Sequence, residues 1–314
     1  MEIITTPFNF NEAIKLVNEN ADIILLTNSD FGLRNNYNCT NDELLKIFEY
    51  HTKKKSTSKI WININAFFFE QDIEKLEKYL DFLNIHINQI DRIVFNDFAV
   101  NQICFEQGYK FKLHYDPSTL VTSYGQFDFY IENNINSVSL SNELFLPEVI
   151  TILKNKPKDF EIAIQVHGYV FIMHSRWNLI SNFKNYVEDN NDEYIKQKVY
   201  YIKELNRKFT NIIYEDKHGS HMLSGYELCL LQYIKQLNDL GLNYIKIDDI
   251  YQTENYSLNI YKIYKNAISS IKNNCFNLEQ INNDIEECKK YSKNKILSSG
   301  FIGGIGDILN YEKK

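Results

Sequence analysis

The sequence predicts an α/β protein of the (β/α)8 TIM-barrel type, and three observations support this fold class. Eight short apolar segments lie between residues 3 and 247. Most are rich in Val, Ile and Leu and lack strict alternation, which is typical of parallel strands buried on both faces. Amphipathic segments with apolar residues three and four apart lie between most of them. Strands that alternate with helices in this way close into a barrel surrounded by helices.

The elements follow in order along the chain. The predicted strands are Ile3–Thr5, Asp22–Thr27, Lys59–Asn65, Arg92–Phe95, Phe111–Tyr115, Ser137–Leu140, Glu161–Val166 and Tyr244–Ile247. The predicted helices are Phe10–Asn20, Asn41–Lys53, Gln71–Leu83, Ala99–Glu106, a segment near Thr122–Asn133, Phe145–Lys154, Tyr226–Leu240 and the closing helix Asn255–Lys272. Ser224 is expected to cap the helix that starts at Tyr226, and Gly241 follows that helix as a C-terminal glycine. Cys229 then lies on the helix's apolar face as a core thiol.

Two regions interrupt the alternation. The stretch 171–211 is too long for a strand-to-helix loop and is interpreted as an insertion after the seventh strand, with a helix at Tyr194–Asn206. We therefore expect a barrel domain of residues 1–272 that contains this insertion. Residues 273–314 are expected to form a charged helix, Asn277–Lys295, and a flexible tail. The FIGGIG segment of this tail follows no strand, so it does not indicate a phosphate loop.

Composition limits the possible classes of protein. The chain has 314 residues, 44% of them apolar, and a net charge of −7. It has no apolar run near twenty residues and no signal-peptide pattern, so we expect a cytoplasmic protein without a membrane span. Its five cysteines contain no CxxC pair and fit a reducing compartment. The acidic balance disfavours autonomous binding of nucleic acid, which usually requires a basic face.

Polar residues gather just beyond the predicted strand ends, where barrels carry their active sites. His167, in the His-Gly pair that ends the seventh strand, is a catalytic candidate. Candidates for substrate binding are Arg34, Asn65, His114, Arg176, Lys246 and Asp248. In a barrel, side chains that end parallel strands converge at one mouth. A structural histidine remains the alternative for His167.

A second group of candidates lies in the segment YEDKHGSHMLS, residues 214–224. Asp216, His218 and His221 combine a carboxylate with imidazoles and suit general acid–base catalysis. Metal binding and a purely structural turn are the alternatives, since no HExxH is present and Gly219 favours a turn. No GxSxG motif supports a serine nucleophile. We expect Arg34, His167 and the 216–221 turn to meet at the barrel mouth.

Several of these segments resemble the collagenase-like peptidase family, peptidase family U32. The matching stretches are LLTNSDFGLRNN, QVHG, HSRWNLISNF, YEDKHGSHMLSGYELCLL and GLNYIKIDD, which span most of the chain. The resemblance implies a (β/α)8 catalytic core. It also implies two rival activities, peptide hydrolysis and hydroxylation of RNA, because several members of this family are hydroxylation factors rather than peptidases.

The resemblance further implies a 4Fe–4S cluster on four cysteines in the hydroxylation factors. The positions that correspond to two of those cysteines are Phe171 and Asn178 here, and neither side chain can replace a thiolate. The chain therefore resembles a short branch of the family that lacks the cluster cysteines, and we expect it to carry no cofactor of its own. The family's final-strand glycine and arginine are also absent after Lys246 and Asp248.

The leading hypothesis is thus a cytoplasmic barrel that assists 5-hydroxylation of the wobble uridine of tRNA. It would act as a cluster-less subunit beside a longer, cysteine-bearing paralogue that supplies redox chemistry and contact with tRNA. The aromatic residues Phe171, Trp177, Phe183 and Tyr186 of the insertion are the expected interface anchors. A collagenase-like hydrolase and a non-catalytic barrel that stabilises its partner remain the alternatives.

Overall fold

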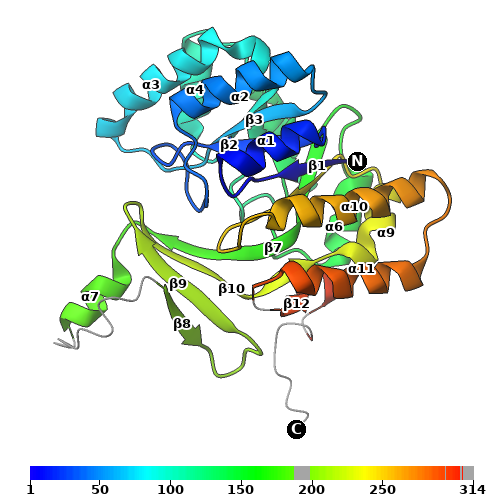
Figure 1. The fold of residues 1–314 in the computed structure, drawn as a ribbon. Coiled ribbons are helices and arrows are strands. Elements are labelled where there is room, and N and C mark those ends of the chain that lie inside the picture. Colours follow the sequence, from blue (N-terminus) through cyan, green and yellow to red (C-terminus); the bar gives the residue numbers. More distant parts are fainter. Residues whose placement is uncertain (187–198, 294, 305, 307–314) are drawn as a thin grey trace.

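The computed structural model confirms the barrel, and it describes residues 1–186, 199–293, 295–304 and 306. Seven parallel strands follow one another around the sheet, and the eighth pairs with both the first and the seventh, which closes the barrel (Figure 1). In order around the barrel they are β1 (Glu2–Thr5), β2 (Ile23–Thr27), β3 (Lys59–Ile64), β4 (Arg92–Phe95), β5 (Leu113–Tyr115), β6 (Ser137–Ser139), β7 (Glu161–Ser175) and β11 (Tyr244–Ile247).

Helices pack around the outside of the strands (Figure 1). They are α1 (Phe10–Asn18), α2 (Asn41–Lys54), α3 (Glu70–Ile85), α4 (Phe98–Glu106), α5 (Phe127–Glu132), α6 (Leu146–Asn155), α9 (Ile234–Asp239), α10 (Tyr256–Lys272) and α11 (Leu278–Tyr291). Capping residues in the sequence determine where several of these helices begin. The side chain of Thr40, for example, caps α2 in a capping box with Glu43. Within the described residues, no helix is both long and apolar enough to cross a membrane.

The apolar core has two layers. The larger layer lies between the strands and the helices and takes the outward-facing residues of the strands, such as Ile245 and Ile247. A smaller cluster fills the barrel interior around Trp61, which is fully buried, together with Ile23 and Tyr244. Because strand side chains alternate between the two layers, the barrel is filled below its mouth and any pocket must lie at the strand ends.

The insertion differs from the prediction. β7 continues past the barrel to Ser175 and forms an antiparallel sheet with β10 (Gly219–Cys229), β9 (Thr210–Asp216) and β8 (Val199–Lys203). This sheet projects from the barrel, with α7 (Leu179–Tyr186) at its far end (Figure 1). The inserted segment thus ends at Cys229 rather than at residue 211.

Two predicted helices are therefore wrong. Residues 199–203 of the expected helix 194–206 form strand β8, and residues 194–198 lie outside the described residues. The expected helix from Tyr226 begins as the end of β10, and only Ile234–Asp239 is α-helical. Ser224 caps no helix. Its buried hydroxyl accepts a hydrogen bond from Val170 N at 2.9 Å and donates one to the carbonyl of Tyr226.

The C-terminal region packs more closely than expected. After α11, the short strand β12 (Leu297–Ser298) pairs in parallel with β10. A 3₁₀ turn at Gly300–Gly303 follows, in which Gly300 is buried and Phe301 packs against Phe145. The expected flexible tail from Gly300 is thus wrong for these four residues, and residues 307–314 lie outside the described residues.

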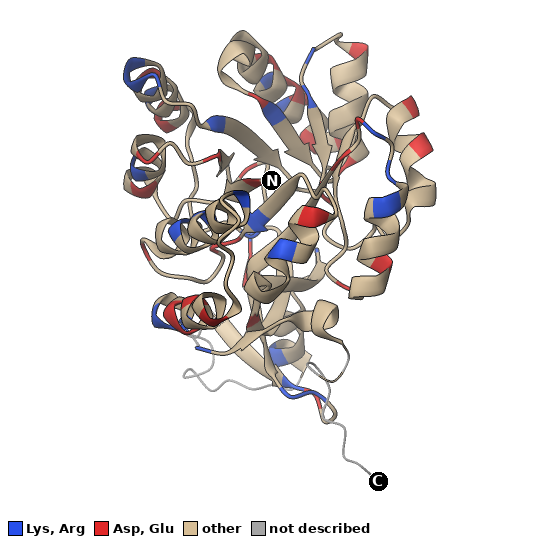
Figure 2. Ribbon diagram, turned by 90° about the vertical axis from the view of Figure 1, so that its right-hand side faces the viewer, with Lys and Arg blue, Asp and Glu red and all other residues tan. Residues whose placement is uncertain are grey.

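Positions of both charge signs are interspersed along the outer helices in the ribbon of Figure 2, where Lys and Arg are blue and Asp and Glu red. Many of them form exposed pairs, such as Lys262 with Glu19.

Candidate functional site

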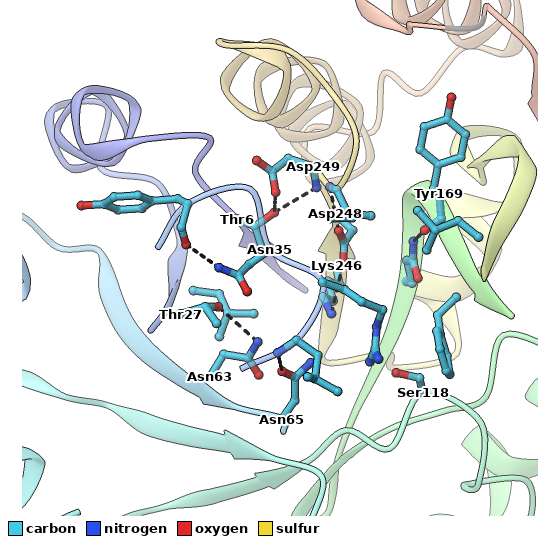
Figure 3. Close-up of a pocket in the computed structure, with 18 of the residues that line it drawn as sticks. Thr6, Thr27, Asn35, Asn63, Asn65, Ser118, Tyr169, Lys246, Asp248 and Asp249 are labelled. Carbon is cyan, nitrogen blue, oxygen red and sulfur yellow. Dashed lines mark hydrogen bonds and ion pairs between the residues drawn. The ribbon is translucent and has the colours of Figure 1, made fainter. Parts of the chain in front are cut away.

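A polar pocket, partly open to solvent, lies at the carboxyl ends of the barrel strands (Figure 3). Four of the expected binding residues line it, and they come from different parts of the chain: Arg34, Asn65, Lys246 and Asp248. Further hydrogen-bonding groups come from Thr6, Thr27, Asn35, Asn63, Ser118, Gln165 and Asp249. These four residues from predicted strand ends thus lie at one mouth of the barrel, and their role in binding stays a prediction.

Lys246 lies between two carboxylates on the pocket floor. Its Nζ is 3.3 Å from Asp116 and 3.4 Å from Asp248, and all three side chains are less than one-fifth exposed. Burial alone would lower the pKa of Lys246, but the two carboxylates outweigh it and raise this pKa. Burial likewise opposes ionisation of Asp116, yet Lys246 and neighbouring cations hold its pKa below the usual value. Lys246 and Asp116 are therefore both ionised near neutral pH.

Arg34 reaches the pocket from the loop after β2, with a left-handed backbone at φ 55°. Asn65, at the end of β3, fixes this loop, because its Oδ1 accepts a hydrogen bond from Leu33 N at 2.7 Å. The guanidinium lies 4.0 Å from the ring centre of Phe171. Burial lowers the pKa of Arg34 and nearby acidic groups oppose this effect; an arginine nevertheless stays protonated in a protein. Arg34 thus presents a cation with one stacked face.

Aromatic side chains of the projecting sheet cover one side of the pocket. Tyr169 and Phe171 of β7, with Leu223 of β10, line it (Figure 3 shows Tyr169). Sequence reasoning did not identify Tyr169. Its only signal is its place directly after the His167-Gly168 pair. The pocket therefore combines planar apolar surfaces with amides, hydroxyls and ions.

Asp249 is a buried carboxyl at the rim of this pocket. It accepts hydrogen bonds from Thr6 Oγ1 at 2.8 Å and from Asn36 Nδ2 at 3.1 Å. Burial, followed by the charge of Asp248, raises the pKa of Asp249 to about 8, although both hydrogen bonds act in the opposite direction. A carboxyl with such a pKa holds a proton at neutral pH and can exchange it with a bound molecule.

We expect the Asp249→Asn variant to gain stability relative to the wild type as the pH rises. Folded Asp249 keeps its proton above the pKa of the unfolded chain, so the wild type loses stability between about pH 4 and pH 8. The asparagine variant lacks this loss, and the difference should grow by up to about 4 kcal/mol between pH 5 and pH 8. Urea unfolding at the two pH values measures it. The exposed Asp239→Asn serves as the control, and an equally flat response of Asp249→Asn would refute the raised pKa.

The second group of candidates forms the turn between β9 and β10. Asp216 Oδ1 accepts hydrogen bonds from His221 Nε2 at 2.9 Å and from His218 N at 2.8 Å. The His221 ring is buried and stacked between His174 and Tyr214. His218 bridges back to the barrel through a 2.7 Å hydrogen bond between its Nε2 and Ser29 O. Asp216 and His218 therefore stand above the β2 loop, whereas His221 is enclosed.

A second, more open groove lies beside the mouth pocket. Asp216, His218 and Tyr251 line it, and it shares Arg34 and Asn35 with the pocket. The 216–221 turn and Arg34 therefore belong to one continuous surface at this end of the barrel, as expected from the sequence. The imidazoles of the turn bind different partners, and the turn forms no metal-like grouping within the described ranges.

Three expected site residues lie elsewhere. His167 is fully buried and contacts Tyr264 and Tyr256 of α10 rather than lining the pocket. His114 lies inside the barrel, where its two ring nitrogens bond to Ser137 Oγ and Ser139 Oγ. Burial lowers the pKa of His114 to about 3, so its imidazole is neutral. Arg176 is exposed, and its guanidinium stacks on Phe69.

The cause of the His167 error is an irregularity in β7. Lys246 pairs with Gln165 and the next residue of β11 pairs with His167, so one extra residue is inserted at Val166. Such a bulge reverses the alternation of side chains. Gln165 therefore faces the pocket and His167 faces the outer helices. Gly168, with φ 102°, returns Tyr169 to the pocket.

The residues present do not fit a four-cysteine iron–sulfur cluster. Phe171 forms part of the pocket wall and Asn178 is exposed between β7 and α7. All five cysteines are described and free, and of these only Cys229 and Cys288 share a grouping with metal-like spacing. A cluster of this kind requires thiolates that this chain does not offer.

Comparisons with known proteins place this geometry in context. The sequence model described as Peptidase family U32 matches residues 8–309. The tRNA hydroxylation protein P2 of Bacillus subtilis (strain 168) is 28% identical over 271 residues, which cover 85% of each chain. The tRNA hydroxylation protein P1 of the same organism is 22% identical and matches 86% of this chain, which spans 63% of that protein. The solved structure of the U32 peptidase Mk0906 aligns with 79% of this chain and 92% of that one, with a TM-score of 0.49 and 12% identity.

Proposed function

Because this chain belongs to peptidase family U32, we propose that it assists the 5-hydroxylation of the wobble uridine of tRNA in the cytoplasm, as a subunit without a cluster of its own. The observation that carries this proposal is the similarity to the tRNA hydroxylation protein P2, which extends over 85% of both chains. The replacement of the expected cluster cysteines by Phe171 and Asn178 supports the absence of redox chemistry within this chain.

The mouth pocket suits a uridine turned out of its RNA strand. Unstacked bases are recognised by stacking on aromatic or arginine planes and by hydrogen bonds to their edges. Arg34 and Phe171 supply such planes, and the amides of Asn63 and Asn65 supply donors and acceptors for the uracil oxygens and N3–H. Lys246 adds a fixed positive charge below them.

The turn between β9 and β10, which lies above the groove, supplies groups that can exchange protons. Asp216 and His218 line the groove next to Arg34, where they can exchange protons with a molecule that extends from the pocket. His221 acts as a positioning residue, since its enclosed ring holds the Asp216 carboxylate from behind. His167 has no part in this assignment, because its side chain does not reach either surface.

Mass spectrometry of tRNA nucleosides tests the proposal. Cells that lack this chain should lose 5-hydroxyuridine derivatives from the wobble position, and a plasmid copy should restore them. Unchanged nucleosides in the deletion strain would contradict the proposal and favour the hydrolase alternative. Release of peptides from denatured collagen by the purified chain, abolished in Asp216→Asn, would then support that alternative.

The proposed partner is a longer, cysteine-bearing member of the same family. The projecting sheet and α7 expose Trp177, Phe183 and Tyr186, which are 72%, 64% and 85% exposed. Large exposed aromatics of this kind are typical anchors of protein interfaces. Phe171, the fourth expected anchor, lines the mouth pocket instead.

We expect Trp177→Ala to weaken the complex with that paralogue at least about tenfold, since an aromatic anchor buried in an interface typically contributes about 2 kcal/mol or more. Titration of the purified chain with the purified paralogue measures the affinity. Phe105→Ala on α4 is the matched control, because Phe105 is also 72% exposed but lies on the barrel. Equal affinities of wild type and Trp177→Ala would exclude this surface as the interface.

A further inference from the structure

A cluster of metal-binding side chains lies behind the mouth pocket, among the outer helices. His167, Cys229 and Cys288 each offer one ligand atom, and these atoms all lie within 4.8 Å of one another. His167 and Cys229 are paired residues on neighbouring strands β7 and β10, whereas Cys288 comes from α11. All three side chains are at least 95% buried. The function proposed above uses none of them.

The hydrogen bonds around His167 leave one ring nitrogen available. The Tyr264 hydroxyl donates to Val166 O at 2.9 Å and lies 3.2 Å from His167 Nδ1. With its hydrogen committed to Val166, that hydroxyl accepts the proton of Nδ1. Nε2 then carries a lone pair, and this atom is buried without any hydrogen-bond partner. Metal-binding histidines typically show this arrangement, in which the second nitrogen donates to a fixed acceptor.

We propose that His167, through its free ring nitrogen, and the sulfurs of Cys229 and Cys288 form a binding site for Zn²⁺. Nitrogen and thiolate ligands are those that Zn²⁺ prefers, at about 2.0–2.3 Å from the ion. Two thiolates neutralise its charge, which limits the cost of placing an ion in the protein interior. The ligands need to approach by only about 1 Å, because tetrahedral bonds of that length place them a little under 4 Å apart.

The site would fasten α11 to the strands of the barrel. Cys288 is the contribution of this helix, and the two other ligands belong to strands that continue into the projecting sheet. A bound ion therefore joins the C-terminal region, the barrel and the sheet at one point. Metal that binds only the folded chain stabilises it.

The test uses the full-length chain, without a histidine tag and purified under reducing conditions. We expect about one Zn²⁺ per chain by elemental analysis. Replacement by Co²⁺ should give the charge-transfer bands of thiolate-to-cobalt bonds. Chain without bound metal that takes up neither ion, or a Co²⁺ spectrum without thiolate bands, would overturn the proposal. So would a disulfide between Cys229 and Cys288 in the freshly isolated protein.

Variants locate the ion. Cys288→Ser should weaken Zn²⁺ binding at least about 100-fold in competition with a chelator, the upper range for loss of a group that merely supports a ligand. Cys104→Ser is the matched control, because Cys104 is also a buried, free helix cysteine. His167→Gln provides a second variant if Cys288→Ser does not fold. Wild-type affinity in a folded Cys288→Ser or His167→Gln would refute the assignment.

Discussion

Replacing Lys246 by methionine is expected to abolish complementation of the deletion strain, so that tRNA lacks the hydroxylated uridine. Lys246 supplies the positive charge on the floor of the mouth pocket, and it lies between Asp116 and Asp248, whose negative charges it offsets in part. Without it, two partly buried carboxylates repel each other and any negative or carbonyl oxygen of a bound uridine. The readout is the same nucleoside mass spectrometry.

The same variant should lose about 2–4 kcal/mol of stability near neutral pH. This is somewhat less than the ~3–5 kcal/mol for fully buried ion pairs, since these side chains keep some exposure. The pKa of Asp116 is lowered in the folded wild type, so its stabilisation exists above the unfolded pKa and is lost as the pH falls through the folded pKa. The pKa of Lys246 is raised, so its contribution is lost only at strongly alkaline pH. The deficit of the variant should therefore shrink below about pH 4.

Lys262→Met is the matched control for this experiment. Lys262 forms an ion pair with Glu19 at 3.0 Å, but both side chains are nearly half exposed. Exposed pairs contribute at most about 1 kcal/mol, and neither Lys262 nor Glu19 lines the mouth pocket or the groove. The control should complement fully. If Lys246→Met also complements fully while folded, the pocket is not the site of function.

Strand identity and strand ends were predictable from the sequence for a physical reason. Each barrel strand is buried on both faces, so it appears as a short apolar run with polar residues where it leaves the core. That signal located Lys246 and Asp248 at the end of the last strand and Asn65 at the end of the third, and all three line the pocket. Their distances could not be predicted, because they depend on the closure of the barrel between β7 and β11.

The projecting sheet could not be predicted in the same way. β10 is buried along almost its whole length, so its apolar residues carry no alternation and also fit a helical spacing. The Tyr226–Leu240 helix prediction failed at this point. The predicted orientation of the His167 side chain was wrong for a related reason, because a bulge leaves no pattern in the sequence. Only the adjacent Gly168 indicates that the backbone conformation is unusual at this point.

Gly168 leads to the second large effect that we expect. Its φ of 102° is one that residues with side chains rarely adopt, and a Cβ there would lie 2.1 Å from the carbonyl oxygen of Asp248. Asp248 N also donates to His167 O at 3.1 Å, so the two strand ends are tightly joined. Gly168→Ala must therefore displace the backbone of a pocket residue. We expect a loss of about 3 kcal/mol or more, the sum of backbone strain and overpacking.

Gly108→Ala separates the two contributions. Gly108 also has a positive φ, 69°, but a Cβ there would meet nothing within 4 Å. This control should lose only about 1 kcal/mol, the lower end of the cost of strain alone. Urea unfolding measures both variants, and complementation at reduced temperature, where Gly168→Ala is still folded, reports on the pocket. Equal stability losses in the two variants would mean that the backbone at the β7–β11 junction shifts at little energetic cost to accept the added methyl group. A folded Gly168→Ala that fails to complement would instead show that this junction sets the position of Asp248.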